Sequence, residues 1–226
     1  VKYLAPFSLK TIYNPRPIIS RVISFLCRNL RVPLPLWRGI HSSIDPFARR
    51  LVNESCDLWI FPSQDLFSYT IDVPSLGTIH DLMHRYERQF EELSANGEYE
   101  AREFHYKNMV STAKGVLVDS NIGKEQAVES YGVVESKIHV LPFIAPSYIY
   151  SDQTPDDFDE KYKLPPKFIF YPAQFWTHKN HLGLIRAANI IQADYPDFKL
   201  VFVGSMKNAY ASCIDLVSEL ELSSSI

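Results

Sequence analysis

The chain has 226 residues, of which 46% are hydrophobic and 22% are charged, and its formal net charge is −3. These proportions are typical of a globular protein, and the charge balance argues against a nucleic-acid binder. No apolar run approaches the ~20 residues that are needed to span a bilayer. The length allows one large domain or two small ones.

Basic residues are concentrated at the start of the chain. Residues 1–44 contain seven Lys and Arg and no acid, so the remainder carries a net charge of −10. Residues 17–31 show helical periodicity, with one broad apolar stripe and arginines beside it. Such a segment suits either a membrane surface, which would be contacted through residues 16–38, or a core helix with solvated arginines. We favour the core helix.

Short apolar runs that follow predict buried strands, with helices at 99–113 and 121–131 between some of them. The predicted strands are Leu58–Phe61, Ser75–Ile79, Gly115–Val118 and Lys137–Leu141. Ser120 follows a strand and precedes a helix, as an N-cap residue does. Strands that alternate with helices predict a parallel sheet covered on both faces, with ligands beyond the carboxyl ends of the strands.

Two polar residues follow the strand Ser75–Ile79. His80 and Asp81 lie at the carboxyl end of this strand, where a histidine can donate to a substrate oxygen and an aspartate can orient it. Metal binding by His80, Asp81 and His84 is an alternative, and it would indicate a metal-dependent phosphohydrolase. A histidine that only satisfies loop backbone is a third interpretation.

The pattern breaks at residues 144–166, which are rich in proline and aspartate and predict an inter-domain linker between a domain at 1–143 and a second at 167–226. The second domain begins with a strand at Lys167–Tyr171 and a helix at 181–194. A strand at Lys199–Val203 and a helix near 209–220 follow. Two α/β domains joined by a linker predict a ligand site in a cleft between them.

The loop between the first strand and first helix of this second domain contains Lys179. This lysine is either simply solvated or placed to bind an anion, and the helix dipole, which disfavours a cation at a helix start, favours the anion. A diphosphate leaving group is such an anion, and its charge grows as its bond to a sugar breaks. Gly204 ends the next strand, where it forms either a plain turn or a close backbone approach to a ligand.

Several protein classes are disfavoured by missing motifs. The sequence has no G-x-G-x-x-G or G-x-x-x-x-G-K-[ST] loop, which argues against nicotinamide and P-loop proteins. No G-x-S-x-G elbow occurs, which argues against an α/β-hydrolase. The three cysteines, Cys27, Cys56 and Cys213, include no C-x-x-C and predict free core thiols in a reducing cytoplasm.

The run FIFYPAQFWTHKNHLGLIRAANII, followed by DYPDFKLVFVGS, resembles the start of the C-terminal domain of retaining GT-B-fold glycosyltransferases of family 4. The segments GTIHDLMHRYERQF and VLVDSNIGKEQAVESYGVVESKIHVLPF are similar to the N-terminal domain of that family. The resemblance covers about residues 55–222, and residues 171–181 are its most specific part. The motif AQFWxHKNH resembles a subgroup assigned to polysaccharide biosynthesis and labelled as mannosyltransferases.

The resemblance implies an α/β protein with two Rossmann-like domains and transfer of a sugar with retention. The donor, a nucleoside-diphosphate sugar, would bind the C-terminal domain, and a glycan or lipid-linked acceptor would bind the N-terminal one. No metal and no cofactor are implied. Lys179 falls on the diphosphate-binding lysine and His80 on the histidine near the transferred sugar. Gln174, Asn180 and Gly204 are further donor-side positions, and many members have an arginine where this chain has Gln174.

The resemblance also implies parts that this sequence does not contain. The family's two glutamates, which bracket a glycine-rich loop, would follow well beyond residue 226, and the first strand of the N-terminal domain would precede residue 1. We therefore expect a fragment that is inactive or nearly so on its own. A non-catalytic binding domain is a further alternative, since Gln174 lacks the charge of the arginine.

Overall fold

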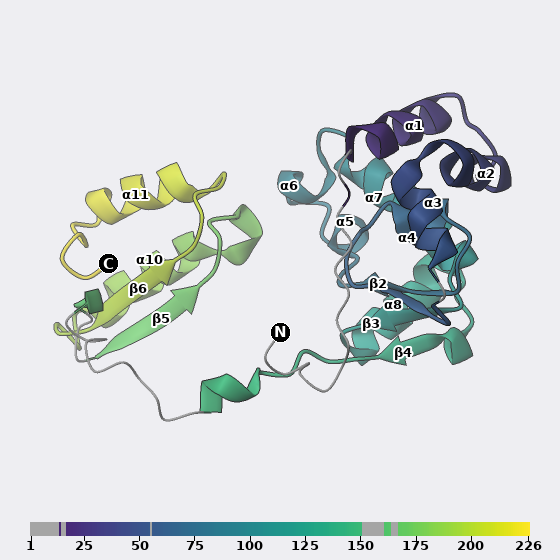
Figure 1. The fold of residues 1–226 in the computed structure, drawn as a ribbon. Coiled ribbons are helices and arrows are strands. Elements are labelled where there is room, and N and C mark those ends of the chain that lie inside the picture. Colours follow the sequence, from purple (N-terminus) through teal and green to yellow (C-terminus); the bar gives the residue numbers. More distant parts are fainter. Residues whose placement is uncertain (1–13, 15–16, 55, 151–160, 164–166) are drawn as a thin grey trace. The chain divides into compact units, whose positions relative to one another are not determined.

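A computed structural model describes residues 14, 17–54, 56–150, 161–163 and 167–226 (Figure 1). They form two compact units. Unit 1 contains the described residues up to Tyr86 together with Tyr99–Phe143, and unit 2 contains Glu87–Glu98 and the described residues from Ile144 to Ile226. Much of the predicted linker, residues 151–160 and 164–166, lies outside the described residues. The assignment of Glu87–Glu98 to unit 2 was not predicted from the sequence.

Unit 1 is built on a sheet of four parallel strands in the order β1-β2-β3-β4. The strands are β1 (Trp59–Phe61), β2 (Ser75–Ile79), β3 (Gly115–Val118) and β4 (Ile138–Val140). The helices are α1 (Pro17–Asn29), α2 (Leu34–Ile44), α3 (Pro46–Asn53), α4 (Phe67–Thr70), α5 (Met83–Tyr86), α7 (Glu98–Thr112), α8 (Asn121–Tyr131) and the 3-10 helix η2 (Glu135–Lys137).

The central contact of unit 1 is between β2 and α7. Gly77 of β2 faces Met109, and a Cβ atom at this glycine would lie 2.0 Å from the Met109 sulfur. The missing side chain therefore lets α7 pack directly on the sheet. The Ser120 hydroxyl accepts a hydrogen bond from the Gly123 N–H at 3.1 Å, which confirms the predicted N-cap of α8.

Only one side of helix α1 is buried in the core. This corrects the interpretation that we favoured from the sequence, in which α1 is a core helix with solvated arginines. Its residues Ile23 and Cys27 are buried in the core of unit 1. Ile19 is partly buried against the same core, and the other residues of the predicted apolar stripe face outward, including Ile18, Val22 and Phe25. Helical periodicity gives the direction of a stripe, but it does not show how much of a broad stripe a neighbouring element covers.

Unit 2 contains a pair of parallel strands, β5 (Phe168–Pro172) and β6 (Lys199–Val203). Its helices are α6 (Glu91–Ser94), α10 (His181–Ile191), α11 (Tyr210–Glu219) and the 3-10 helices η3 (Ser147–Tyr150) and η4 (Thr177–Lys179). Phe175, Ile185 and Cys213 belong to the core between strands and helices. Cys56, in contrast, is exposed, so the prediction of core thiols is wrong for this cysteine. No helix among the described residues is long and apolar enough to cross a membrane.

His105 makes the stability of unit 1 depend on pH. Its ring lies against Tyr69 and Tyr106, and burial lowers its pKa to about 4. The unfolded chain binds this proton near pH 6.5 and the folded chain does not, so stability is lost as the pH falls from 6.5 towards 4. We expect the free energy of unfolding of the unchanged chain to fall by about 1 kcal/mol more between pH 6 and pH 5 than that of the His105→Phe variant. Urea denaturation at the two pH values measures both. Equal pH slopes for the two proteins would refute this assignment.

Candidate functional site

The loop between β5 and α10 is held tightly at the carboxyl end of β5. The Phe175 N–H donates to the Ser205 carbonyl at 3.1 Å, and the Phe175 carbonyl accepts from the Ala209 N–H at 3.0 Å. Gly204 is needed here, because a Cβ atom at this position would lie 2.1 Å from the carbonyl oxygen of Ala173. The close approach therefore shapes the loop itself, and it gives Gly204 a structural role.

The same loop presents Lys179 at the start of α10. The Tyr171 hydroxyl donates to the Lys179 carbonyl at 2.8 Å, and Asn180 has a left-handed backbone with φ of 54°. The Asn180 side chain accepts a hydrogen bond from the Gly183 N–H at 3.2 Å and caps the helix. The Lys179 side chain is exposed, and its ammonium has no ion pair with any carboxylate in the described part of the chain. A cation therefore lies free beside a positive helix end.

His181 has a structural role instead. Its ring is buried and stacks on Phe175 at a centroid distance of 4.4 Å, and its Nε2 lies 3.2 Å from the Ala173 carbonyl oxygen. Burial lowers the pKa of His181, so the ring is neutral at pH 7. His181 thus anchors the first turn of α10 to the loop that carries Lys179.

Glu92 of α6 binds the other side of this loop. Its Oε1 accepts from the His178 N–H and lies 3.0 Å from His178 Nδ1, and its Oε2 accepts from Asn208 Nδ2 at 3.1 Å. Burial opposes ionisation of Glu92, but these hydrogen bonds outweigh it and hold its pKa at about 2. The carboxylate is therefore charged at neutral pH and fixes the turn next to Lys179. The sequence offered no signal for it, because Glu92 is distant along the chain.

A second cation lies beside the predicted donor position Gln174. The exposed Gln174 side chain accepts a hydrogen bond from Trp176 Nε1 at 2.9 Å, and the Lys207 ammonium lies 4.9 Å from the centre of the Trp176 ring. Sequence reasoning missed Lys207, which follows β6 and approaches only because β5 and β6 are parallel neighbours. Trp176 of the loop thus contacts both Lys207 and the amide of Gln174.

In unit 1, His80 and Asp81 follow β2 as predicted, but they have separate partners. The His80 Nε2 lies 2.7 Å from the Pro62 carbonyl oxygen, and its exposed ring stacks on Phe143. Asp81 instead accepts from the Met83 N–H at 3.0 Å and from Arg102 at 2.8 Å. In this structure the Pro62 carbonyl, rather than Asp81, orients the His80 ring.

The alternative metal site at His80, Asp81 and His84 is wrong. His84 is buried, and its Nε2 lies 3.0 Å from Glu103 Oε1. No group of three or more His, Cys, Asp or Glu side chains among the described residues is arranged to hold a metal ion. Because α5 turns the His84 ring into the protein, the three side chains do not converge.

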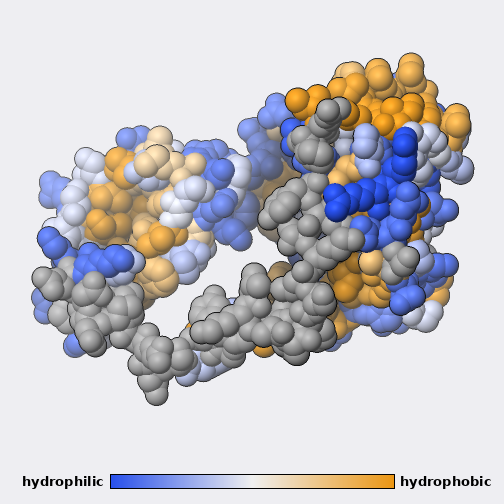
Figure 2. Space-filling model, viewed as in Figure 1, coloured by the Kyte–Doolittle hydropathy of each residue, from blue (hydrophilic) through white to orange (hydrophobic). Residues whose placement is uncertain are grey.

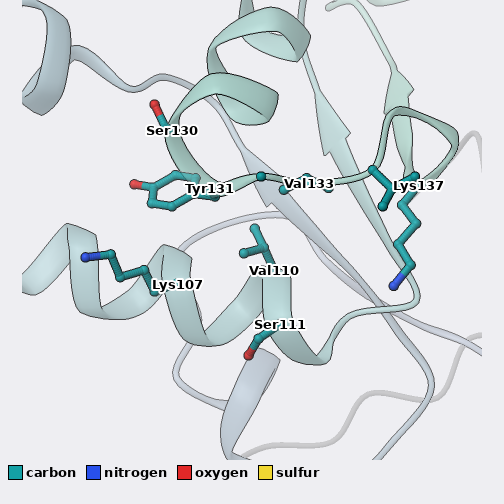
Figure 3. A pocket seen from close by; sticks show the side chains of 9 residues that line it. Lys107, Val110, Ser111, Ser130, Tyr131, Val133 and Lys137 are labelled. Carbon is teal, nitrogen blue, oxygen red and sulfur yellow. The ribbon is translucent and has the colours of Figure 1, made fainter.

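A pocket of about 440 Å³ lies near Glu103, between the ends of α7 and α8 (Figure 3). Lys107 and Ser111 of α7 line it together with Tyr131, Val133 and Lys137. This pocket adjoins the amino ends of β3 and β4, whereas ligands of parallel α/β sheets bind beyond the carboxyl ends. None of the predicted site residues lines it.

The parallel sheets, their covering helices and the two units define an α/β protein with the GT-B fold of glycosyltransferases. One similar structure is that of HepE from Anabaena in complex with UDP and glucose. Its TM-score is 0.60 at 14% identity, over 86% of this chain and 52% of HepE. A glycosyltransferase from Rickettsia africae has a TM-score of 0.58 at 19% identity, over 100% of this chain and 55% of that protein.

A third similar structure is a variant of TarM from S. aureus, solved with UDP and two further ligands. Its TM-score is 0.55 at 13% identity, over 79% of this chain and 34% of TarM. The chain thus spans about half the length of HepE and of the Rickettsia protein. No protein-family model and no curated protein sequence matches the chain.

Proposed function

We propose that this chain is part of a retaining glycosyltransferase that transfers a sugar from a nucleoside-diphosphate donor to a glycan or lipid-linked acceptor. Unit 2 supplies the diphosphate-binding loop, and unit 1 supplies His80 for the transferred sugar. Mannose as the sugar and polysaccharide biosynthesis as the role follow from the resemblance of residues 171–181 to the AQFWxHKNH subgroup. The cytoplasm is the expected compartment, because nothing in the cysteine spacing calls for disulfides.

One observation carries the proposal, namely that the exposed Lys179 at the start of α10 has no ion pair with a carboxylate of the described residues. The first N–H groups of a helix have no hydrogen-bond partner inside the helix. In α10 the Asn180 side chain accepts a hydrogen bond from one of them, the N–H of Gly183. The remaining N–H groups and the ammonium favour a bound anion, and they stabilise a diphosphate most when it leaves the sugar with full charge. We assign to Lys207, which lies against the Trp176 ring beside Gln174, the positive charge that Gln174 lacks.

His80 has the geometry of a hydrogen-bond acceptor for a sugar hydroxyl, rather than of the donor that the sequence suggested. Its Nε2 is held by the Pro62 carbonyl, so this nitrogen carries the proton and Nδ1 is an acceptor. Asp81 acts indirectly, since its ion pair with Arg102 and its bond to the Met83 N–H fix the turn after β2. We assign His80 to contact with the sugar and Asp81 to the positioning of the loop.

Titration of nucleotides into the 15N-labelled chain tests the proposal. UDP, UDP-glucose and GDP-mannose should shift the backbone amide signals of Lys179, Asn180 and His181, because the diphosphate is common to all three. AMP, which carries no diphosphate, should leave them unchanged. Saturable shifts that are confined to unit 1 residues would contradict a donor site in unit 2.

A further inference from the structure

We infer that the outer face of α1, continued by the start of α2, docks unit 1 on an anionic lipid surface. The patch consists of exposed apolar side chains on one side of α1 and beyond its end, namely Ile18, Val22, Phe25, Leu26, Leu30 and Leu36. Figure 2 shows it as the hydrophobic area over α1 at the top of unit 1. This inference is independent of the sugar donor and goes beyond the transfer reaction.

The patch does not result from a poorly packed helix. Ile23 and Cys27 on the opposite side of α1 are buried in the core of unit 1, and Ser24 donates to the Ser20 carbonyl within the helix. The helix is therefore fixed in place while Phe25 is left 66% exposed and Ile18 71% exposed. Contiguous apolar residues on a well-anchored element mark an interaction surface rather than a folding defect.

Charge identifies the partner as an anionic surface. Arg21 is exposed on α1 and Arg31 is exposed beyond the helix end, while the exposed Arg28 places its guanidinium 5.1 Å from the centre of the Phe104 ring. None of these three arginines has an ion pair with a carboxylate among the described residues. Between residues 17 and 50 the chain has six arginines and a single acid, Asp45, whose carboxylate is buried. Apolar side chains flanked by cations without carboxylate partners are the pattern of helices that lie in the headgroup region of anionic membranes.

A second copy of this chain is the less suitable occupant of the patch. A two-fold dimer through α1 would bring Arg21, Arg28 and Arg31 of one copy towards the same residues of the other. No acid lies on α1 to compensate for them. Like charges at such an interface oppose association, whereas anionic headgroups favour it.

Co-sedimentation of the full chain with lipid vesicles tests the inference without any nucleotide or sugar. Vesicles with about 30 mol% phosphatidylglycerol in phosphatidylcholine should bind the chain at low salt, and pure phosphatidylcholine vesicles should bind it much less. Phe25→Ser should weaken binding about tenfold, because one aromatic side chain no longer enters the interface. Arg21→Gln should weaken it about fivefold, and only on the anionic vesicles.

Ile122→Ser is the matched control, since Ile122 is also 66% exposed but lies on α8 outside the patch. It should bind like the unchanged chain. Absence of binding to anionic vesicles, or equal binding by Phe25→Ser and Ile122→Ser, would overturn the inference. A dimer in sedimentation equilibrium that Phe25→Ser dissociates would also overturn it and assign the patch to a second copy. Circular dichroism checks that each variant is folded.

Discussion

Replacing Glu103 by alanine is expected to lower the free energy of unfolding by about 3–5 kcal/mol. The Glu103 carboxylate is buried, and Arg85 donates to it through Nε at 2.6 Å and Nη2 at 2.7 Å. The Tyr131 hydroxyl donates at 2.9 Å and His84 lies at 3.0 Å from the same carboxylate. Removing the carboxylate leaves these donors buried without an acceptor. The free-energy cost of burying unpaired polar groups is larger than the contribution of any single hydrogen bond.

Urea denaturation of Glu103→Ala and Glu103→Gln measures this effect. The glutamine keeps one acceptor oxygen but loses the charge, so its loss of stability should be smaller than that of alanine. Glu125→Ala, at an exposed position of α8, is the control and should change stability by less than about 0.5 kcal/mol. A loss below about 1 kcal/mol in Glu103→Ala would show that the network adds little to stability.

Because Glu103 ionises, the contribution of the same network to stability depends on pH. Hydrogen bonds from Arg85 hold the pKa of Glu103 well below its usual range, and those from Tyr131 and His84 add to the effect. Its contribution to stability is therefore complete above the unfolded pKa near 4.5 and is lost as the pH falls towards the lowered folded pKa. Acid unfolding of Glu103→Gln should accordingly show a shallower pH dependence below about pH 4.5.

Replacing Lys179 by alanine is expected to weaken binding of a nucleoside-diphosphate sugar by about 1.5–3 kcal/mol, which is roughly tenfold to a hundredfold. The ammonium forms a charge-assisted contact with the diphosphate, and the loop is already fixed by Glu92, Tyr171 and Asn180, so little ordering accompanies binding. Titration calorimetry with UDP-glucose, or NMR titration where binding is weak, gives the two affinities.

Lys167→Ala is the matched control, because this exposed lysine precedes β5 and lies at its amino end. It should leave donor affinity unchanged. Lys207→Ala should weaken binding less than Lys179→Ala, since its ammonium is shared with the Trp176 ring. If Lys179→Ala and Lys167→Ala bind the donor equally, Lys179 does not hold the diphosphate and the proposed donor site is wrong.

The strands of both units could be predicted from the sequence because they are short apolar runs between polar ones. Ser75–Ile79, Gly115–Val118 and Lys199–Val203 were predicted with their observed bounds. The predicted α8 at 121–131 also agrees, since Ser120 caps it and Gly132 ends it in a left-handed conformation. Helices α4, α5 and α6 were not predicted, because four residues are too few to establish a helical period.

By itself the sequence determined the parallel α/β architecture and the position of Lys179 at a helix start, because both follow from local patterns of a few residues. Only the tertiary structure decided that Glu92 and Lys207 flank the Lys179 loop, that His84 turns inward to Glu103, and that α1 buries one side while exposing the other. These features depend on contacts between residues far apart in the chain. Periodicity and spacing describe each segment alone, and they carry no information about which surface of one element another will cover.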